Sequence, residues 1–318
     1  MFAFINLTVH LWFTLSTVNL MDAEGFTSIE NQREACSWES SNENFTTHRA
    51  LLASRIHSLE ELKRIVKVDY FPKDTVDKTA TKYVCLTYSS MGKEISAVLK
   101  EGIDQDEIVK AKDGSLLDKL SILFKDPFAI KIRDNLKRIN ILARRFRIKY
   151  GDEDLAFYDL GLASLKNIRK TEHSFTTALD SSENGYINTF NHVTAQALIS
   201  SIFGIETAEF VAVVHERENM PELMDKNVIS NLNNSDMINQ AVDNYVDLLN
   251  NKMGQLLGSA LSNKYNINRR TVWNEQLLSS YLNDVQEFYR YSFNISMKPF
   301  NEDDEIVIRF SRKLKAVL

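Results

Sequence analysis

Apolar side chains recur at helical spacing over most of the chain, and this pattern predicts a mainly α fold: a helical bundle with a small α+β N-terminal region. Ser115 is expected to cap one helix, and Asp126 with Pro127 is expected to open the next. β-branched and aromatic residues predict a short strand at 82–88, and 305–310 is expected to be an edge strand. The predicted helices cover 51–66, 91–113, 116–124, 127–148, 154–168, 186–203, 206–217, 236–261 and 271–293.

The N-terminus has the composition of a secretory signal. Residues 2–20 contain no Asp, Glu, Lys or Arg, and Ala23 supplies a small residue near a plausible cleavage point. An N-terminal helix or a membrane anchor is the alternative. No later run reaches the roughly 18 apolar residues that a membrane span needs. We therefore expect a secreted protein without a membrane span after cleavage.

Turn signals and composition divide the chain into four segments. The turn Asp113-Gly114-Ser115 marks the main boundary. The predicted segments are a signal peptide at 1–23, an α+β region at 24–114, a helical domain with the candidate site at 115–262, and a C-terminal helix with a short strand at 263–318.

Composition removes several classes of protein. With only 10 Gly and 4 Pro in 318 residues, a β-sandwich or barrel with many turns is not expected. The net charge of −5 gives no reason to expect a nucleic-acid partner. The stretch 131–149 is nevertheless basic; we interpret it as the solvated face of a helix, and the alternative is contact with an anion or a membrane. Cys36 and Cys85 are either one disulfide or two separate buried thiols.

Polar side chains interrupt three consecutive predicted helices on faces that should pack inward. Burying a polar group without a partner costs about 1–3 kcal/mol, so these residues form either a satisfied network or a site. His192 lies on an apolar helix face, and Asp247 shares a face with Asn251, whereas Asp243 is expected to be solvated. Gly254, one turn further along, would let a neighbouring backbone approach closely.

These residues support hydrolytic chemistry in two ways. Two imidazoles and a carboxylate could hold a divalent metal with a bound water; without a metal, a histidine oriented by a carboxylate could act as general base. Asn219 stands where a His-Glu-x-x-His motif needs its second histidine, so zincin chemistry is not indicated. The expected catalytic residues are His192, His215, Glu216 and Asp247, the expected metal ligands are His192, His215 and Asp247, and the expected cofactor-binding residues are Asn250, Asn251 and Gly254.

Three ordered stretches carry a resemblance to a known family. Thr189-Phe-Asn-His192-Val-Thr-Ala-Gln-Ala197, Val214-His215-Glu216 and Asp247-Leu-Leu-Asn250-Asn251-Lys-Met-Gly254 resemble an uncharacterised helical domain of bacterial secreted and toxin-like proteins. The resemblance covers residues 116–261 and implies a helical domain, but no particular reaction.

Departures from the family pattern leave the activity open. Asn191 replaces an arginine of that family, and Ala195 replaces a tryptophan. Loss of the arginine removes a fixed cation with bidentate donors. Three hypotheses therefore remain: a secreted hydrolase, a non-catalytic secreted binding or effector protein whose polar residues form a core network, and a degenerate enzyme.

Overall fold

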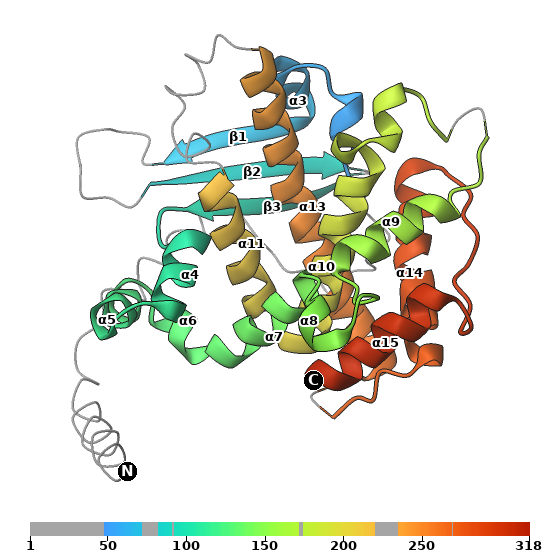
Figure 1. Ribbon diagram of the computed structural model, residues 1–318. Helices are drawn as coiled ribbons and strands as arrows, with labels where there is room; N and C mark the ends of the chain where they lie inside the picture. The colour runs from blue at the N-terminus through green and yellow to red at the C-terminus, as the bar shows by residue number, and fades with distance from the viewer. Residues whose placement is uncertain (1–47, 72–81, 91, 172–173, 220–234, 269) are drawn as a thin grey trace. The chain divides into compact units, whose positions relative to one another are not determined.

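The computed structural model describes residues 48–71, 82–90, 92–171, 174–219, 235–268 and 270–318, and it confirms a mainly α protein (Figure 1). Across these described ranges, no helix combines the length and the apolar character needed to cross a bilayer. The segment predicted to be a signal peptide lies outside the described residues, as does Cys36.

The described strands form one antiparallel sheet in the order β1-β2-β3, made of Val66–Phe71, Tyr83–Ser90 and Lys93–Lys100. β2 is central and confirms the strand predicted at 82–88. Its Cys85 pairs with Val98 of β3 in the sheet register, and this cysteine is buried and disulfide-bonded.

The helix predicted over 91–113 is wrong in its first half. β3 occupies that part because Ile95, Ala97 and Leu99 alternate toward the core, at the period of two that a strand requires. The helix α4, Gln105–Asp113, begins only after Asp104, whose carboxylate caps it in a capping box with Glu107.

The helix predicted over 51–66 is also much shorter in the structure. α3 comprises only Leu59–Ile65 and is capped by Ser58, whose hydroxyl accepts a hydrogen bond from Glu61 N. The chain then enters β1 directly at Val66.

A single helix predicted over 127–148 is three helices in the structure. The helix before this segment, α5, Leu116–Lys125, is separate and is capped by Ser115 as predicted. The chain then breaks at Ile132, which leaves helical geometry, and again at Arg144, which is extended. The resulting helices are α6 Pro127–Lys131, α7 Arg133–Ala143 and α8 Arg147–Tyr150.

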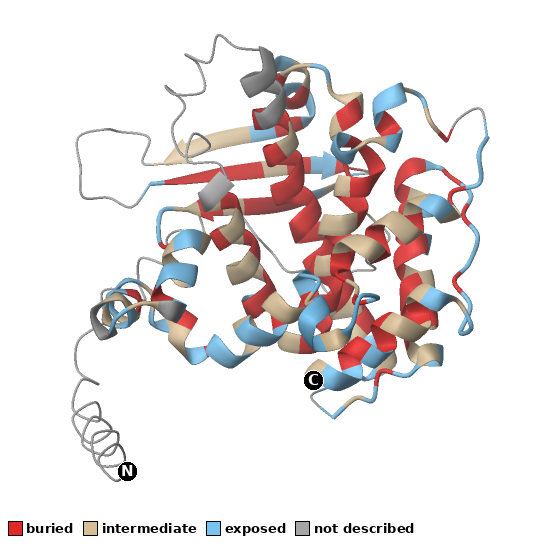
Figure 2. Ribbon diagram, in the orientation of Figure 1, coloured by how far each residue is buried: buried red, intermediate tan, exposed pale blue. Residues whose placement is uncertain are grey.

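The helix α10, Asn188–Phe203, lies at the centre of the helical part and is buried along most of its length (Figure 2). Five of the described α-helices contact it: α7 and the helices α9 Phe157–Asn167, α11 Ile205–Asn219, α13 Ser235–Tyr265 and α14 Glu275–Phe293. α11 and α13 also contact β3, so the sheet and the helices pack against one another.

Two glycines set the closeness of α10 and α13. A Cβ atom at Gly254 would lie 2.7 Å from the carbonyl oxygen of Val193, and one at Gly258 would lie 2.2 Å from that of Ala197. Both distances are too short for a side chain. The close approach of a backbone predicted at Gly254 is therefore confirmed, Gly258 extends it by one turn, and the approaching element is α10.

The edge strand predicted at 305–310 is wrong: this segment begins the helix α15, Glu305–Val317. Its buried side chains Val307, Phe310 and Leu314 recur at helical spacing. Lys313 fixes the helix by donating to Asp154 Oδ2 at 2.9 Å and to the backbone carbonyl of Arg144 at 2.8 Å.

Candidate functional site

Three mutually contacting helices bring most of the predicted residues together. α10 contributes His192, α11 contributes His215 and Glu216, and α13 contributes Asp247 and Asn251. Helical periodicity turns each of these positions toward the neighbouring helices, as the sequence predicted.

Asn251 connects His192 to Glu216. Its Oδ1 lies 2.9 Å from His192 Nδ1, and its Nδ2 donates to Glu216 Oε1 at 3.0 Å. Because the amide oxygen accepts, Nδ1 of His192 carries a proton in this arrangement. Asn251 and Glu216 are 2% and 1% exposed, so this connection is deep in the protein.

Asn188, at the start of α10, makes a similar connection between two carboxylates. Its Nδ2 donates to Asp247 Oδ1 at 2.9 Å and to Asp243 Oδ1 at 3.2 Å. The other nitrogen of His192, Nε2, lies 3.3 Å from Asp247 Oδ2. A continuous polar chain results, with the order Glu216, Asn251, His192, Asp247, Asn188, Asp243.

Asp243 corrects one sequence prediction. It was expected to be solvated, but it is half-buried and accepts from Asn188 one helical turn before Asp247. The burial of Asp243 depends on the packing of α10 against it. The pattern of apolar residues within α13 carries no information about that neighbour. The spacing of four residues between Asp243 and Asp247 was the available signal, since it places both carboxylates on one face.

Two other predicted residues have different neighbours. Asn250 is fully buried and binds the backbone of Leu51, accepting from its N–H at 2.9 Å and donating to its carbonyl at 2.9 Å. Gly254 packs against the backbone of α10. These contacts are structural, and the structure does not bring Asn250 or Gly254 into the polar chain.

The pKa values of the two histidines are shifted in opposite directions. Burial lowers the pKa of His192, but the carboxylates of Asp247 and Glu216 outweigh burial, so its pKa is raised overall. Burial, with a contribution from His192, lowers the pKa of His215 to about 4. The rings lie 6.4 Å apart between centroids. The two imidazoles are therefore shifted in opposite directions, His192 toward its protonated form and His215 toward its neutral form.

The carboxylates hold protons more tightly than usual. Burial, assisted by the charge of Asp247, raises the pKa of Glu216 to about 8 and that of Asp243 to about 7. Burial also raises the pKa of Asp247, opposed by His192 and by the amide of Asn188. Glu216 is thus protonated at neutral pH, while Asp243 exchanges its proton near neutrality.

The predicted metal ligands do not fit a metal ion in this arrangement. Nδ1 of His192 faces Asn251, and Nε2 faces Asp247, so neither nitrogen presents a lone pair to a cation. Within the described ranges, no group of three or more His, Cys, Asp and Glu side chains has the geometry to hold a metal.

The polar chain has the parts of an acid–base site. Two carboxyl groups with raised pKa values, Glu216 at about 8 and Asp243 at about 7, lie on either side of an imidazole whose pKa is also raised. Clusters of groups with perturbed pKa values are typical of acid–base sites. Of these groups Asp243 is more exposed than Glu216, so it is the carboxylate better placed to meet a substrate.

Comparisons with protein-family models, with curated proteins and with solved structures find no match to this chain. Support for a function therefore comes from the residues of the site.

Proposed function

We propose that the protein is a secreted hydrolase that works by acid–base catalysis at the polar chain. The observation that carries this proposal is the burial of Glu216, Asp243 and Asp247 around the imidazole of His192, with no lysine or arginine of the described residues paired to these carboxylates. Secretion is proposed from the uncharged N-terminal stretch alone.

Stability alone gives little reason for this arrangement. Buried carboxylates are normally paired or replaced by apolar side chains, because desolvation of each charge is costly. Here the protein keeps them together, and burial raises their pKa values, which favours the uncharged form and lowers the cost of desolvation. Groups with strongly perturbed pKa values in one cluster are more common at functional sites than elsewhere.

The proposed roles follow from exposure and charge. Asp243, half-buried with a pKa near 7, takes a proton from the attacking water and returns it to the leaving group as the scissile bond breaks. His192, whose two ring nitrogens face Asn251 and Asp247, makes no hydrogen bond to the substrate in this scheme; its raised pKa favours a positive charge beside the carboxylates, which stabilises negative charge that develops nearby. Glu216 keeps its proton and, through Asn251, fixes the position of the imidazole.

The test is a screen for hydrolysis of p-nitrophenyl acetate, p-nitrophenyl phosphate, bis(p-nitrophenyl) phosphate, p-nitrophenyl glycosides and fluorescein-labelled casein. Wild-type protein is compared with Asp243→Asn, and with Glu206→Gln as a control on an exposed carboxylate of α11. We expect turnover of one probe, a loss of about 100-fold or more in kcat for Asp243→Asn, and no change for Glu206→Gln. Equal rates for wild type and Asp243→Asn on every probe contradict the proposal.

A second candidate function rests on the deep burial of one end of the polar chain, formed by Glu216 and Asn251. Glu216 and Asn251 are almost fully buried, as expected if the residues form a core network in a non-catalytic binding or effector protein. That candidate predicts marked unfolding by Asp243→Asn as well as no turnover. A variant with wild-type thermal stability and lost activity favours the hydrolase.

A further inference from the structure

The helices α6 to α8 lie on the side of the molecule facing the viewer in Figure 1, and their Lys and Arg side chains are exposed. α7 turns Ile139 and Leu142 into the core, which leaves its charged residues outside. We use the name basic face for the exposed residues Arg133, Lys137, Arg138, Arg144, Arg147 and Lys149. Asp134 is the one carboxylate in the stretch 131–149.

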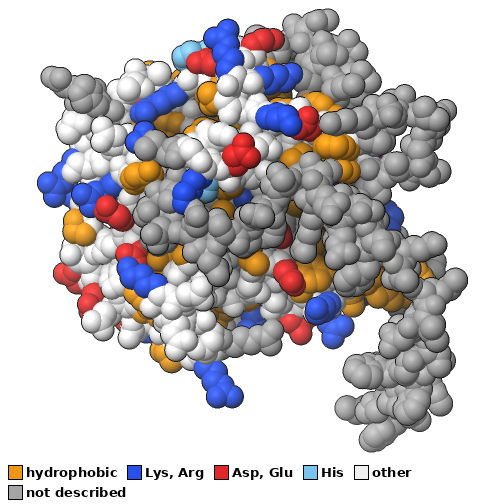
Figure 3. Space-filling view, turned by 180° about the vertical axis from the view of Figure 1, so that it is seen from behind, with side chains coloured by type: hydrophobic (Ala, Val, Ile, Leu, Met, Phe, Trp, Pro, Cys, Tyr) orange, Lys and Arg blue, Asp and Glu red, His pale blue; other side chains and the backbone are white. Residues whose placement is uncertain are grey.

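The charge of this surface is largely uncompensated. Arg133 and Lys137 share Asp134, at 4.0 and 3.1 Å. Arg145, beside the basic face, is paired with Asp159. Among the described residues, no ion pair involves the other four members of the basic face. The opposite side of the molecule differs, because its Lys and Arg side chains are interspersed with Asp and Glu (Figure 3).

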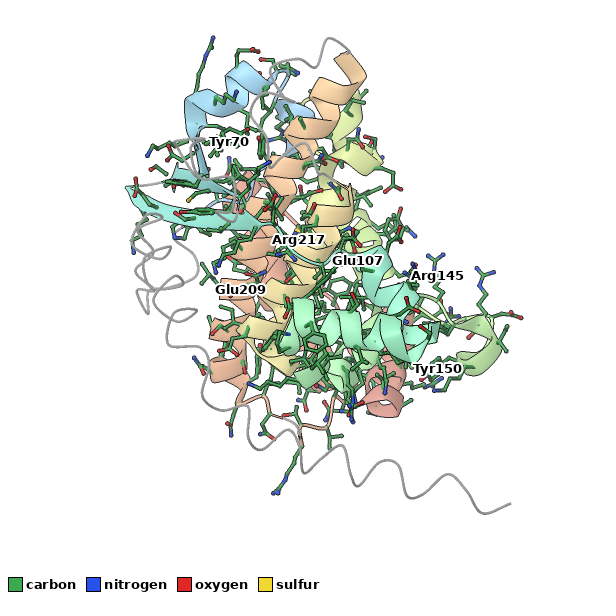
Figure 4. The ribbon with its side chains drawn as sticks, turned by 90° about the vertical axis from the view of Figure 1, so that its left-hand side faces the viewer. Tyr70, Glu107, Arg145, Tyr150, Glu209 and Arg217 are labelled. Carbon is green, nitrogen blue, oxygen red and sulfur yellow. The ribbon has the colours of Figure 1, made fainter. Side chains whose placement is uncertain are left out.

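A large apolar side chain lies within the same surface. Ile148, on α8, is completely exposed, with a relative accessibility of 107%. Its neighbours in sequence, Arg147 and Lys149, are both exposed, and Lys149 also lies over the ring of Tyr150, 5.0 Å from the centroid. Figure 4 shows Tyr150 and Arg145 along the same edge of the structure, where the end of α7 is followed by α8.

We propose that the basic face and Ile148 are a docking surface for an anionic lipid bilayer. Lys and Arg side chains near such a surface are attracted to the phosphate and carboxylate groups of the lipids. Ile148 can enter the boundary between headgroups and acyl chains, where its exposed apolar surface leaves water. The basic side chains around it remain at headgroup level.

The exposed side chain of Ile148 favours an anionic bilayer over a nucleic acid as the partner of this surface. A nucleic acid would satisfy the basic face through its phosphates, but it offers no apolar environment at the position of Ile148. The net charge of −5 also means that attraction must come from this surface alone, so binding should weaken steeply with salt.

The test is co-sedimentation of the full chain with vesicles. One set is phosphatidylcholine alone, and the other contains about one-third phosphatidylserine, so that the surface carries a negative potential. We expect binding only to the anionic vesicles and its loss on adding salt. The triple variant Arg144→Gln, Arg147→Gln, Lys149→Gln should bind about 100-fold more weakly, roughly fivefold for each lost charge.

Two further variants make the result specific. Ile148→Ser should weaken binding about tenfold, because the apolar contact is lost while all charges remain. The triple variant Lys63→Gln, Arg64→Gln, Lys298→Gln removes the same charge from exposed positions on α3 and after α14, and it should bind as wild type does. Thermal unfolding confirms that each variant is folded.

Three outcomes overturn the proposal. The first is no sedimentation of the wild type with anionic vesicles at low salt. The second is equal loss of binding in the two triple variants, which would show a response to total charge only. The third is full binding by Ile148→Ser together with equally tight binding of a DNA duplex, which would make the surface a general polyanion site.

Discussion

His192 on α10 and Asp247 on α13 meet at 3.3 Å between Nε2 and Oδ2, with 13% and 9% of their side chains exposed. This contact lies between further carboxyl groups, because Glu216 and Asp243 are on either side of it in the polar chain. The protonation of the whole group therefore affects both the stability of the fold and the proposed chemistry.

Glu216→Gln should flatten the pH dependence of stability. The folded-state pKa of Glu216 is about 8, above its ordinary value of 4.5, so the folded protein binds the proton more tightly between these values. Its contribution to stability is therefore lost as pH rises through about 8. Wild type should lose up to about 1.4 kcal/mol of unfolding free energy per pH unit from this group.

Urea unfolding between pH 7 and pH 8 measures this effect. In that window His215 adds little slope, since its folded-state pKa is about 4 and its ordinary value is 6.5. Asp243, with a pKa near 7, acts in the same direction as Glu216. Glu206→Gln, on the exposed side of α11, is the control and should keep the wild-type slope. An unchanged slope in Glu216→Gln would show that Glu216 is already ionised in the folded state.

Asn251→Ala should destabilise the protein by about 2–4 kcal/mol. The substitution removes the acceptor for His192 and the donor to Glu216 at once, and each buried group left without a partner costs about 1–3 kcal/mol. Asn263→Ala, at an exposed position of the same helix, should change stability by less than about 0.5 kcal/mol. Similar unfolding midpoints for both variants would mean that Asn251 is not a structural link.

Gly258→Ala should destabilise the protein even though alanine favours a helix by about 1 kcal/mol over glycine. The added methyl would lie 2.2 Å from the carbonyl oxygen of Ala197, so α10 and α13 must separate. We expect a loss of about 1–3 kcal/mol, the usual cost of overpacking. Thermal unfolding of Gly258→Ala and of Ser259→Ala, the next position of α13, measures it. A gain in stability for Gly258→Ala would mean that the two helices are not in close contact.

Lys313→Met should destabilise the protein by about 3–5 kcal/mol, because it leaves the carboxylate of Asp154 buried without its counter-ion. Both side chains are 2% exposed. The double variant Lys313→Met, Asp154→Asn should recover part of the loss, since the remaining side chain is neutral. Chemical denaturation of the two single variants and the double variant gives the coupling energy. Additive effects would contradict a direct interaction.

The site was largely predictable from sequence because each helix is a local structure. The positions of His192, Glu216 and Asp247 follow from 3.6-residue periodicity within their own helices. Asp243 was missed since its burial depends on Asn188, which belongs to another helix. The structural contacts of Asn250 were missed for a similar reason: Leu51, its partner, is far away in sequence.

The errors in the fold have the same physical origin. Ile95, Ala97 and Leu99 look compatible with a charged helix until β2 supplies hydrogen bonds along one edge. The segment 305–310 looks like a strand when only six residues are considered, but Leu314 extends its apolar face at helical spacing. Short apolar runs leave helix and strand unresolved, and the deciding contact lies outside the run.

The two hydrogen bonds between the side chain of Asn250 and the backbone of Leu51 have a consequence for how the chain folds during synthesis. Leu51 binds a residue 199 positions later, and the neighbouring Ala50 N–H donates to Ser292, 242 positions later. This segment leaves the ribosome early, yet its partners are made near the end of translation. The residues around Leu51 therefore wait longest for their native contacts, and they dock only after α13 and α14 have been synthesised.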